Sequence, residues 1–426
     1  MRALAVLTVL FLLATSPAAA QFRQYTAPGS LAQVEITTKE RIETGAEEAR
    51  WNLGGLRLDP RFSLRNVAYL NNVFASPTEE DEVSDFRGTV GGGLAGYLHL
   101  GPKVIASGYV IPEYNWWREQ ADLRQWTNNF GLGVFGYFNR LSVQLDGTRT
   151  ERQQFLNSEL QVPTDIRQDR VRVAMEVNLT GPWDLFASVI QDRLRYKTDV
   201  DEELQPVDVT LLDRDELIGI LGIEYTLRNG LGIGVGAEYS EAEFLDDPGK
   251  RSNSGTSPLL RANYFGNQFD LNLDLVYRIL DFEQNAKVNN FEDLTGGLRL
   301  RWKPSERFEP TLYGGRELIY SASSFDSFYL EDLLGISFGS QLHDRLRLRV
   351  FGETGSNDYS VSAGDFADRQ DDFNRFGGDL IISLTHKISL DLGITRTDYD
   401  SNLPGFDRTL TYFIANVNFG TDPLPW

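Results

Sequence analysis

The most regular pattern in this chain is an alternation of apolar and polar residues with a period of two. Between positions 269 and 279 one side reads Leu271, Leu273, Leu275, Tyr277 and Ile279, and the other reads Asp270, Asn272, Asp274 and Arg278. Successive side chains of a strand point to opposite faces, so this segment predicts a strand with hydrocarbon on one face and water on the other. Similar segments recur to the C-terminus.

Two kinds of connection separate these segments. Short turns rich in Gly, Pro, Asn and Asp lie at 100–102, 139–140, 180–182, 228–230, 266–267, 303–305, 343–344 and 386–387. Longer polar stretches lie at 75–85, 118–125, 153–165, 198–214, 243–256, 283–290, 321–327, 356–372 and 400–408. Eight short turns and nine long stretches join eighteen strands, with both ends of the barrel segment on the side of the short turns.

An even number of strands with this asymmetry is typical of bacterial outer-membrane barrels. We therefore predict an all-β fold, an 18-stranded antiparallel up-and-down transmembrane β-barrel with short periplasmic turns and long extracellular loops. Its surroundings would be outer-membrane lipid and lipopolysaccharide. Barrels of about 16 to 18 strands are wide enough to leave an aqueous channel.

The alternation also assigns side chains to the interior. Val171, Val173 and Met175 alternate with Arg170 and Arg172, and the same holds for the arginines of two later segments. An arginine on the lipid face costs about 2 to 4 kcal/mol at the bilayer midplane, so the charged side should face the lumen. The predicted pore-lining residues are Arg170, Arg172, Glu176, Asp270, Asp274, Arg299, Arg301, Arg345, Arg347 and Arg349. Opposed charges there could brace the wall, form a hydrated conduit, or do both.

Two segments do not give a clear face. Apolar residues occupy both parities at 183–196 and 217–227, so the register of these strands stays open. The last predicted strand ends at Phe419, and seven residues follow it to Trp426. An aromatic residue at the end of the last strand resembles the assembly signal of outer-membrane barrels, and either Phe419 or Trp426 could serve as that signal.

The segments outside the barrel are recognised by composition. Residues 1–20 combine Arg2, a short apolar run and Ala18, Ala19 and Ala20, which predicts a cleaved secretory signal peptide. Residues 21–52 are polar and mixed, with helical character from Thr38 to Ala49, and we expect a periplasmic extension or a small plug. The barrel is predicted at 53–420 and a C-terminal tail at 421–426.

Composition excludes several classes of chemistry. The chain has no Cys, so it has neither a disulfide framework nor a cysteine nucleophile. Its net charge of −20 argues against nucleic acid as a partner. The three histidines, His99, His343 and His386, lie beside predicted short turns, which leaves none for a base at the outer rim or a multi-histidine metal site. We predict no enzyme activity, no cofactor and no metal.

Glycine patterns at 91–96 and 131–136 match the dinucleotide fingerprint by letter. That motif needs a helix beginning within it, so that the helix N-terminus meets the pyrophosphate. Both patterns lie inside predicted strands instead. We interpret these glycines as structural residues of the barrel wall.

One stretch resembles a known family. Residues 61–64, Arg-Phe-Ser-Leu, lead to Tyr69-Leu-Asn-Asn-Val-Phe74, then to an acidic loop and to Ser84-Asp85-Phe86. This resembles the opening hairpin of a β-barrel porin family found in exopolysaccharide operons, whose motif reads Tyr-Asp-Asp/Ser-Asn-Val/Ile-Phe. Leu70 and Asn71 depart from the polar residues of that motif. The resemblance covers about 58–96 and implies a wide barrel of the same strand number, without catalysis.

Three functions follow as expectations. The resemblance implies a conduit for exopolysaccharide export, working with a periplasmic polysaccharide-export protein. The first alternative is a general diffusion porin for small solutes, which the polar lumen would also admit. The third is a structural or adhesion barrel whose lumen is plugged by residues 21–52.

Overall fold

The computed structural model describes residues 28–33, 37–74, 76, 80, 82–154, 163–197, 208–247, 250–282, 290–305, 307–322, 327–359, 369–385 and 387–419. The predicted signal peptide at 1–20, the predicted tail at 421–426 and parts of several predicted long loops lie outside these residues. His386 and Trp426 also lie outside them.

The described chain consists of long strands with a few short helices. The helices are η2 (Ser30–Ala32), α2 (Thr38–Glu48), η4 (Ala121–Leu123) and η5 (Val209–Leu212). The strands are β1 (Trp51–Leu53), β2 (Leu56–Leu70), β3 (Asp85–His99), β4 (Val104–Trp117), β5 (Gln125–Tyr137), β6 (Leu141–Gln154), β7 (Thr164–Asn178), β8 (Trp183–Lys197), β9 (Arg214–Thr226), β10 (Leu231–Phe244), β11 (Asn253–Phe265), β12 (Phe269–Phe282), β13 (Phe291–Trp302), β14 (Phe308–Tyr320), β15 (Phe328–His343), β16 (Leu346–Asp358), β17 (Gln370–Thr385), β18 (Ile388–Ser401) and β19 (Arg408–Phe419).

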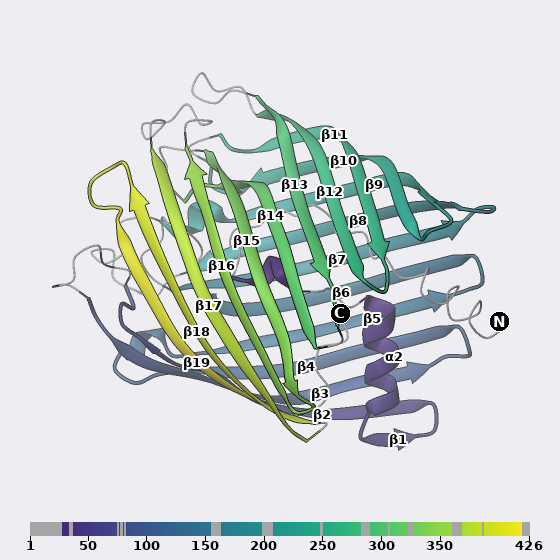
Figure 1. Cartoon of the computed structure of the whole chain (residues 1–426), viewed down its shortest axis with the longest axis horizontal. Helices are drawn as coiled ribbons and strands as arrows, with labels where there is room; N and C mark the ends of the chain where they lie inside the picture. The colour runs from purple at the N-terminus through teal and green to yellow at the C-terminus, as the bar shows by residue number, and fades with distance from the viewer. Residues whose placement is uncertain are drawn as a thin grey trace.

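Strands β2 to β19 form a closed ring in which each strand pairs antiparallel with its sequence neighbours (Figure 1). Pairing of β19 with β2 closes it, from Phe419 opposite Phe62 to Tyr412 opposite Leu70. Within the described residues the ring therefore has the 18 strands predicted from the sequence. The short β1 is an extra strand that the sequence did not predict, and it pairs only with the start of β2.

We call the edge of the ring with the short connections the turn end, and the opposite edge the loop end. The strand halves nearest each edge are the turn half and the loop half. The face assigned from the sequence to hydrocarbon is the more exposed one. On β7, for example, Val171 is 52% exposed and Val173 is 46% exposed, while the alternate Arg172 is partly buried. Gly131 and Gly91 lie within β5 and β3, as the structural interpretation of these glycines requires.

One junction of the ring is incomplete. The register of β13 with β14 runs only from Arg301 opposite Thr311 to Gly296 opposite Arg316. Beyond it, the described loop halves of both strands have no ladder partner across this junction, although β13 still pairs with β12 and β14 with β15. Gly296 has a φ of 139°, and a side chain there would collide with the backbone oxygen of Asp274. The ladder therefore breaks at a position that only glycine fits.

Beyond this break, β14 and β15 bend into the ring. On their outward face Leu312 is 42% exposed and Leu334 is 58% exposed, but in the loop half Leu318 and Phe328 on the same face are buried. These two side chains belong to a cluster that we call the loop-end core. It comprises Ile166, Leu194, Tyr196, Val209, Leu212, Ala242, Phe244, Leu280, Phe282, Phe291, Leu318, Tyr320, Ala322, Phe328 and Leu330.

The other strands contribute their inward side chains to this core. Tyr277 of β12 points outward and is 43% exposed, whereas Leu280 and Phe282 have the opposite parity and are buried. Phe282 stacks on Phe328 with ring centroids 5.2 Å apart. The outer face of the β14–β15 pair thus packs against the inner face of the wall.

Candidate functional site

The turn half of β12 to β17 carries a network of charged side chains. Asp270 accepts from Arg301, and Lys303 approaches its other oxygen at 2.8 Å. Glu309 lies 3.7 Å from Arg301 and 3.3 Å from Arg347. These contacts join several of the predicted pore-lining residues into one cluster. On each of these strands the charged residues alternate with exposed apolar residues, so the charges lie on the inward face.

The remaining charges predicted on β12, β13 and β16 have different partners. Arg349 donates to Asp379 at 2.8 Å, and Arg299 donates to the carbonyl of Gln33. Asp274 lies opposite Arg261 and Gly297 rather than opposite an arginine of β13. Arg345 precedes β16 and lies in the turn, outside the strand where the alternation placed it.

The predicted residues of β7 lie on another arc of the wall. Arg170 pairs with Asp192 at 2.7 Å, and Arg172 pairs with Asp146 at 3.0 Å. Glu176 lies opposite Ser142 and Phe186 in the ladder. Cross-strand pairs of opposite charge on one face stabilise a sheet, so these contacts brace the wall whatever else they do.

The segment 28–33 packs against the inner wall on β13 to β16. The amide of Gly29 donates to Glu353 at 2.8 Å, and Arg349 donates to the Gly29 carbonyl at 3.2 Å. The Glu353 carboxylate also accepts from the hydroxyl of Tyr313 at 3.0 Å. Ala32 belongs to an apolar cluster that includes Leu333, Tyr313 and Phe373. The segment is therefore held by both polar and apolar contacts.

Helix α2 packs against a different arc of the wall (Figure 1). Its N-cap is Thr37, whose hydroxyl accepts from the amide of Glu40. Ile42 and Ala46 pack into a cluster with inward residues of β3, β4 and β5, namely Ala95, Tyr97, Ile105, Tyr109, Ile111 and Phe135. Any side chain at Gly45 would collide with the ring of Tyr97, so glycine allows this close approach.

Two further contacts fix the C-terminal end of α2 at the turn end. Arg57 donates to the carbonyl of Ala46 at 2.8 Å, and Lys387 donates to that of Glu48 at 2.8 Å. Cations near the last carbonyls of a helix also complement its dipole. Residues 28–33 contact β13 to β16, and α2 contacts β3 to β5, which are two separate arcs of a closed ring. The described residues 28–33 and 37–49 therefore lie inside the barrel.

The loop half has a different interior, which sequence analysis missed. Arg214 is fully buried there, donating to Glu216 at 2.7 Å, to the Leu212 carbonyl at 3.0 Å and to the Tyr196 hydroxyl at 3.2 Å. Arg251 is also buried, and its guanidinium donates to the carbonyls of Leu211 and Ser321.

The helix η5 supplies the centre of this packing. Its residues Val209 and Leu212 belong to the loop-end core, and Asp208 caps it by accepting from the amide of Thr210 at 2.9 Å. Asp213 follows the helix and accepts from the amide of Tyr196 at 2.6 Å. Burial raises the pKa of Asp213 because the charged form is penalised away from water.

A signal for this core was present in the sequence. The segments 183–196 and 217–227, where both parities are apolar, coincide with β8 and β9. Their inward residues Phe186, Ile190, Ile218 and Ile220 form a second buried cluster with Leu259 and Val276. The ambiguous alternation therefore marked two strands that carry apolar residues on both faces, because their inward side chains pack in a buried cluster.

The described residues show neither a metal cluster nor a spanning helix. In the described ranges, no group of three His, Cys, Asp or Glu side chains could hold a metal ion. No helix there is long and apolar enough to cross a membrane.

Comparison with known proteins gives a likeness in fold. No family model matches the chain, and no curated protein matches it. Among solved structures, OccAB4 of Acinetobacter baumannii has a TM-score of 0.49 at 14% identity, with 85% of this chain and 98% of that chain covered. The outer membrane protein OpdK of Pseudomonas aeruginosa has a TM-score of 0.49 at 11% identity, with 85% and 98% covered.

The FrpB iron transporter of Neisseria meningitidis is also similar, with a TM-score of 0.48 at 9% identity and 84% of this chain covered. The match spans only 63% of the FrpB chain. At these scores and identities the likeness does not extend to function, and the barrel assignment depends on the strand pairing described above.

Proposed function

We propose that this protein is an outer-membrane channel whose lumen is occluded by its own residues 28–33 and 37–49. The observation that carries the proposal is that residues 28–33 and helix α2 pack on the inner face of two separate arcs of a closed 18-strand ring. A barrel of this strand number has room for an aqueous lumen. The segment occupies that space.

The exterior supports a membrane location. Large apolar side chains on the outward face are widely exposed, among them Leu132 at 70%, Leu221 at 58% and Phe413 at 51%. Aromatic residues lie near the turn end on the same face, including Trp183 and Trp302. Exposing so much apolar surface to water is unfavourable in free energy, whereas contact with acyl chains and headgroups is not.

The contacts of residues 28–49 support a displaceable element. Many are single hydrogen bonds of backbone groups, which water could replace. Glu353 accepts from a backbone amide, and Arg349, Arg57 and Lys387 donate to backbone carbonyls. The wall behind residues 28–33 has its own strand pairing, because β14 to β18 are paired along their length with register shifts only near the turn end. Removing the segment should therefore leave the ring intact.

Planar-bilayer conductance tests the proposal. The mature chain should conduct weakly, and deletion of residues 28–49 should raise the conductance several-fold. Gly45→Leu keeps the whole chain but forces α2 away from Tyr97, so it should raise the conductance as well. The matched control is Gly219→Leu, since Gly219 of β9 has open space around its Cβ position.

Two outcomes would overturn this proposal. If neither the deletion nor Gly45→Leu conducts, the loop-end core closes the barrel without this segment, and a structural or adhesion barrel is favoured. If the intact chain conducts as well as the deletion, residues 28–49 do not occlude it.

The narrower proposal concerns the cargo. The resemblance of 58–96 to the exopolysaccharide porins supports polysaccharide export with a periplasmic partner, and the charged turn half would suit a hydrated polymer. Proteoliposomes containing the deletion variant should then release labelled oligosaccharide. Release of small sugars while the longer chains are retained would favour a diffusion porin instead.

A further inference from the structure

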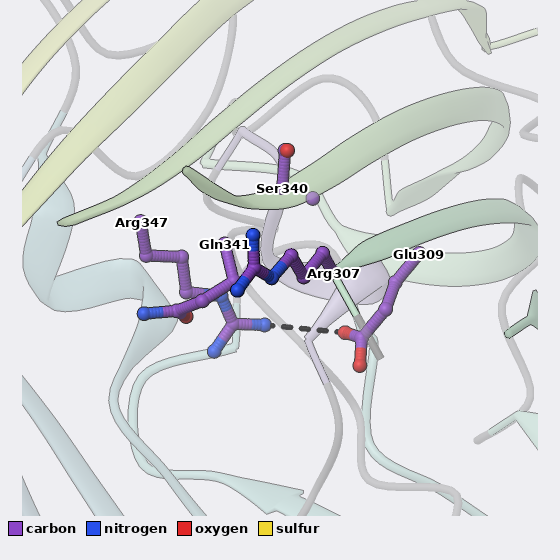
Figure 2. Close-up of a pocket in the computed structure, with 6 residues that line it drawn as sticks. Arg307, Glu309, Ser340, Gln341 and Arg347 are labelled. Atoms are coloured by element: carbon purple, nitrogen blue, oxygen red, sulfur yellow. Dashed lines mark hydrogen bonds and ion pairs between the residues drawn. The ribbon is translucent and has the colours of Figure 1, made fainter. Parts of the chain in front are cut away.

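A small cavity opens on the inner wall at the turn end. It has a volume of about 110 Å³ and is lined by Arg307, Glu309, Gly339, Ser340, Gln341 and Arg347. Arg307 lies directly before β14, and the other residues come from the start of β14, the end of β15 and the start of β16. Figure 2 shows the side chains of Arg307 and Arg347 both reaching into this space, with Glu309 meeting Arg347. The cavity could hold a few water molecules or one small anionic group.

The charge around the cavity is positive, although the whole chain carries −20. Arg301, Lys303, Arg307 and Arg347 lie here with two carboxylates, Asp270 and Glu309. Asp270 is engaged by both Arg301 and Lys303. That leaves Glu309 as the described carboxylate within reach of Arg347.

The two cavity arginines keep hydrogen-bond donors free. Among the described residues, the guanidinium of Arg307 makes no hydrogen bond or ion pair. Arg347 has one partner, Glu309, at 3.3 Å, and its side chain is 52% exposed. A guanidinium has five N–H donors in a planar fork that matches the oxygens of a carboxylate or a phosphate. Two such forks in one cavity can hold an oxyanion between them.

We propose that this cavity is a binding site for the oxyanion group of a solute, a phosphate or a carboxylate. Arg307 and Arg347 would each donate to the anion from the two sides of the cavity. The site faces the interior, because Glu309 and Arg347 share the inward parity of Tyr313 and Glu353. It is therefore open to solutes rather than to lipid headgroups. Binding is independent of whether the barrel conducts.

Calorimetric titration of the full mature protein in detergent tests the site, with inorganic phosphate and acetate as probes and chloride as the reference anion. Phosphate or acetate should bind saturably, and more weakly at high salt. Arg307→Gln should weaken binding by at least about tenfold, because it removes a charge-assisted pair of hydrogen bonds. Arg307→Lys keeps the charge but loses the fork, so it should give an intermediate loss.

Two further variants separate this site from general attraction. Arg345→Gln removes an equal charge from the turn beside the cavity without touching its lining, so binding should change less than about threefold. Glu309→Gln removes the competing carboxylate and should strengthen binding. If Arg307→Gln does not fold, the binding affinity of Glu309→Gln still tests the site.

Absence of saturable binding in the unmodified protein would overturn the site. An equal loss in Arg345→Gln and Arg307→Gln would do the same, because it would show attraction by the rim as a whole. Failure of the conductance experiment leaves this result unaffected.

Discussion

The turn half and the loop half of this barrel enclose different interiors, although the same strands build both. In the turn half the inner wall of β12 to β17 is charged and partly exposed, and residues 28–33 and helix α2 pack on separate arcs of the inner wall. In the loop half an aromatic core lies between the inner face of the wall and the inward-bent strands β14 and β15. A period-two pattern fixes which residues share a face, but it does not fix what that face contacts.

The difference has an energetic consequence. The ion pair of Arg347 with Glu309 in the turn half keeps contact with water, so it contributes little to stability. Arg214 and Glu216 in the loop half are almost fully buried, so removing one partner leaves the charge of the other buried and unpaired. Substitutions in the two halves should therefore differ in the free energy of unfolding by several kcal/mol.

The largest effect is expected from Arg214→Met. Removing the guanidinium leaves Glu216 without its partner in the loop-end core, which should lower the free energy of unfolding by about 3 to 5 kcal/mol. Urea unfolding in lipid or detergent, followed by tryptophan fluorescence, measures this. The double variant Arg214→Met with Glu216→Leu should recover most of the loss. A loss below about 1 kcal/mol in the single variant would mean that water reaches this core.

A smaller effect is expected from Glu353→Ala. It removes the acceptor of the Gly29 amide and of the Tyr313 hydroxyl, which should weaken docking of the segment 28–33 by about 1.5 to 3 kcal/mol. Limited proteolysis should then cut within 28–49 faster, while the barrel stays resistant.

Glu331→Ala is the matched control for this variant. Glu331 shares the partner Arg375 but makes no contact with the segment among the described residues. Equal protease sensitivity of the two variants would count against a specific role of Glu353.

The smallest change in stability, with a clear change in function, is expected from Arg347→Glu. Its side chain is half exposed, so the free energy of unfolding should change by no more than about 1 kcal/mol. Reversal potentials of the variant lacking residues 28–49 should shift toward cations when Arg347→Glu is added.

Arg193→Glu provides the comparison. Its side chain is 59% exposed and has the outward parity of Val189 on β8, so selectivity should not change. If Arg347→Glu leaves the reversal potential unchanged as well, Arg347 does not line a conducting path.

Much of the fold followed from the sequence. Short turns and alternation gave the strand number, and the position of both ends of the ring at the turn end followed from the count. The inward bend of β14 and β15 could not be predicted, because Leu318 and Phe328 continue the outward apolar parity of Leu312 and Leu334. Parity cannot distinguish an apolar face covered by lipid from one covered by the opposite wall.

The candidate site was predicted only in part. The charges of β12, β13 and β16 were assigned from alternation, but their partners depend on register, as the position of Asp274 opposite Gly297 illustrates. The path of residues 28–33 had no signal, since six residues are too few for a period. Within α2, helix propensity marks Gly45 as unfavourable. In the structure, Gly45 is where the helix approaches Tyr97 too closely for any side chain.

Because the β13–β14 pairing ends at Gly296, the loop end can move in a way that a barrel with complete strand pairing cannot. An outward swing of β14 and β15 together would separate Arg316 from Asp293, now 2.7 Å apart, and would expose the aromatic packing. Across the described loop halves of β13 and β14, it would break no backbone ladder. At the loop end, side-chain contacts rather than backbone hydrogen bonds therefore hold β14 next to β13, and they set the width of the barrel there.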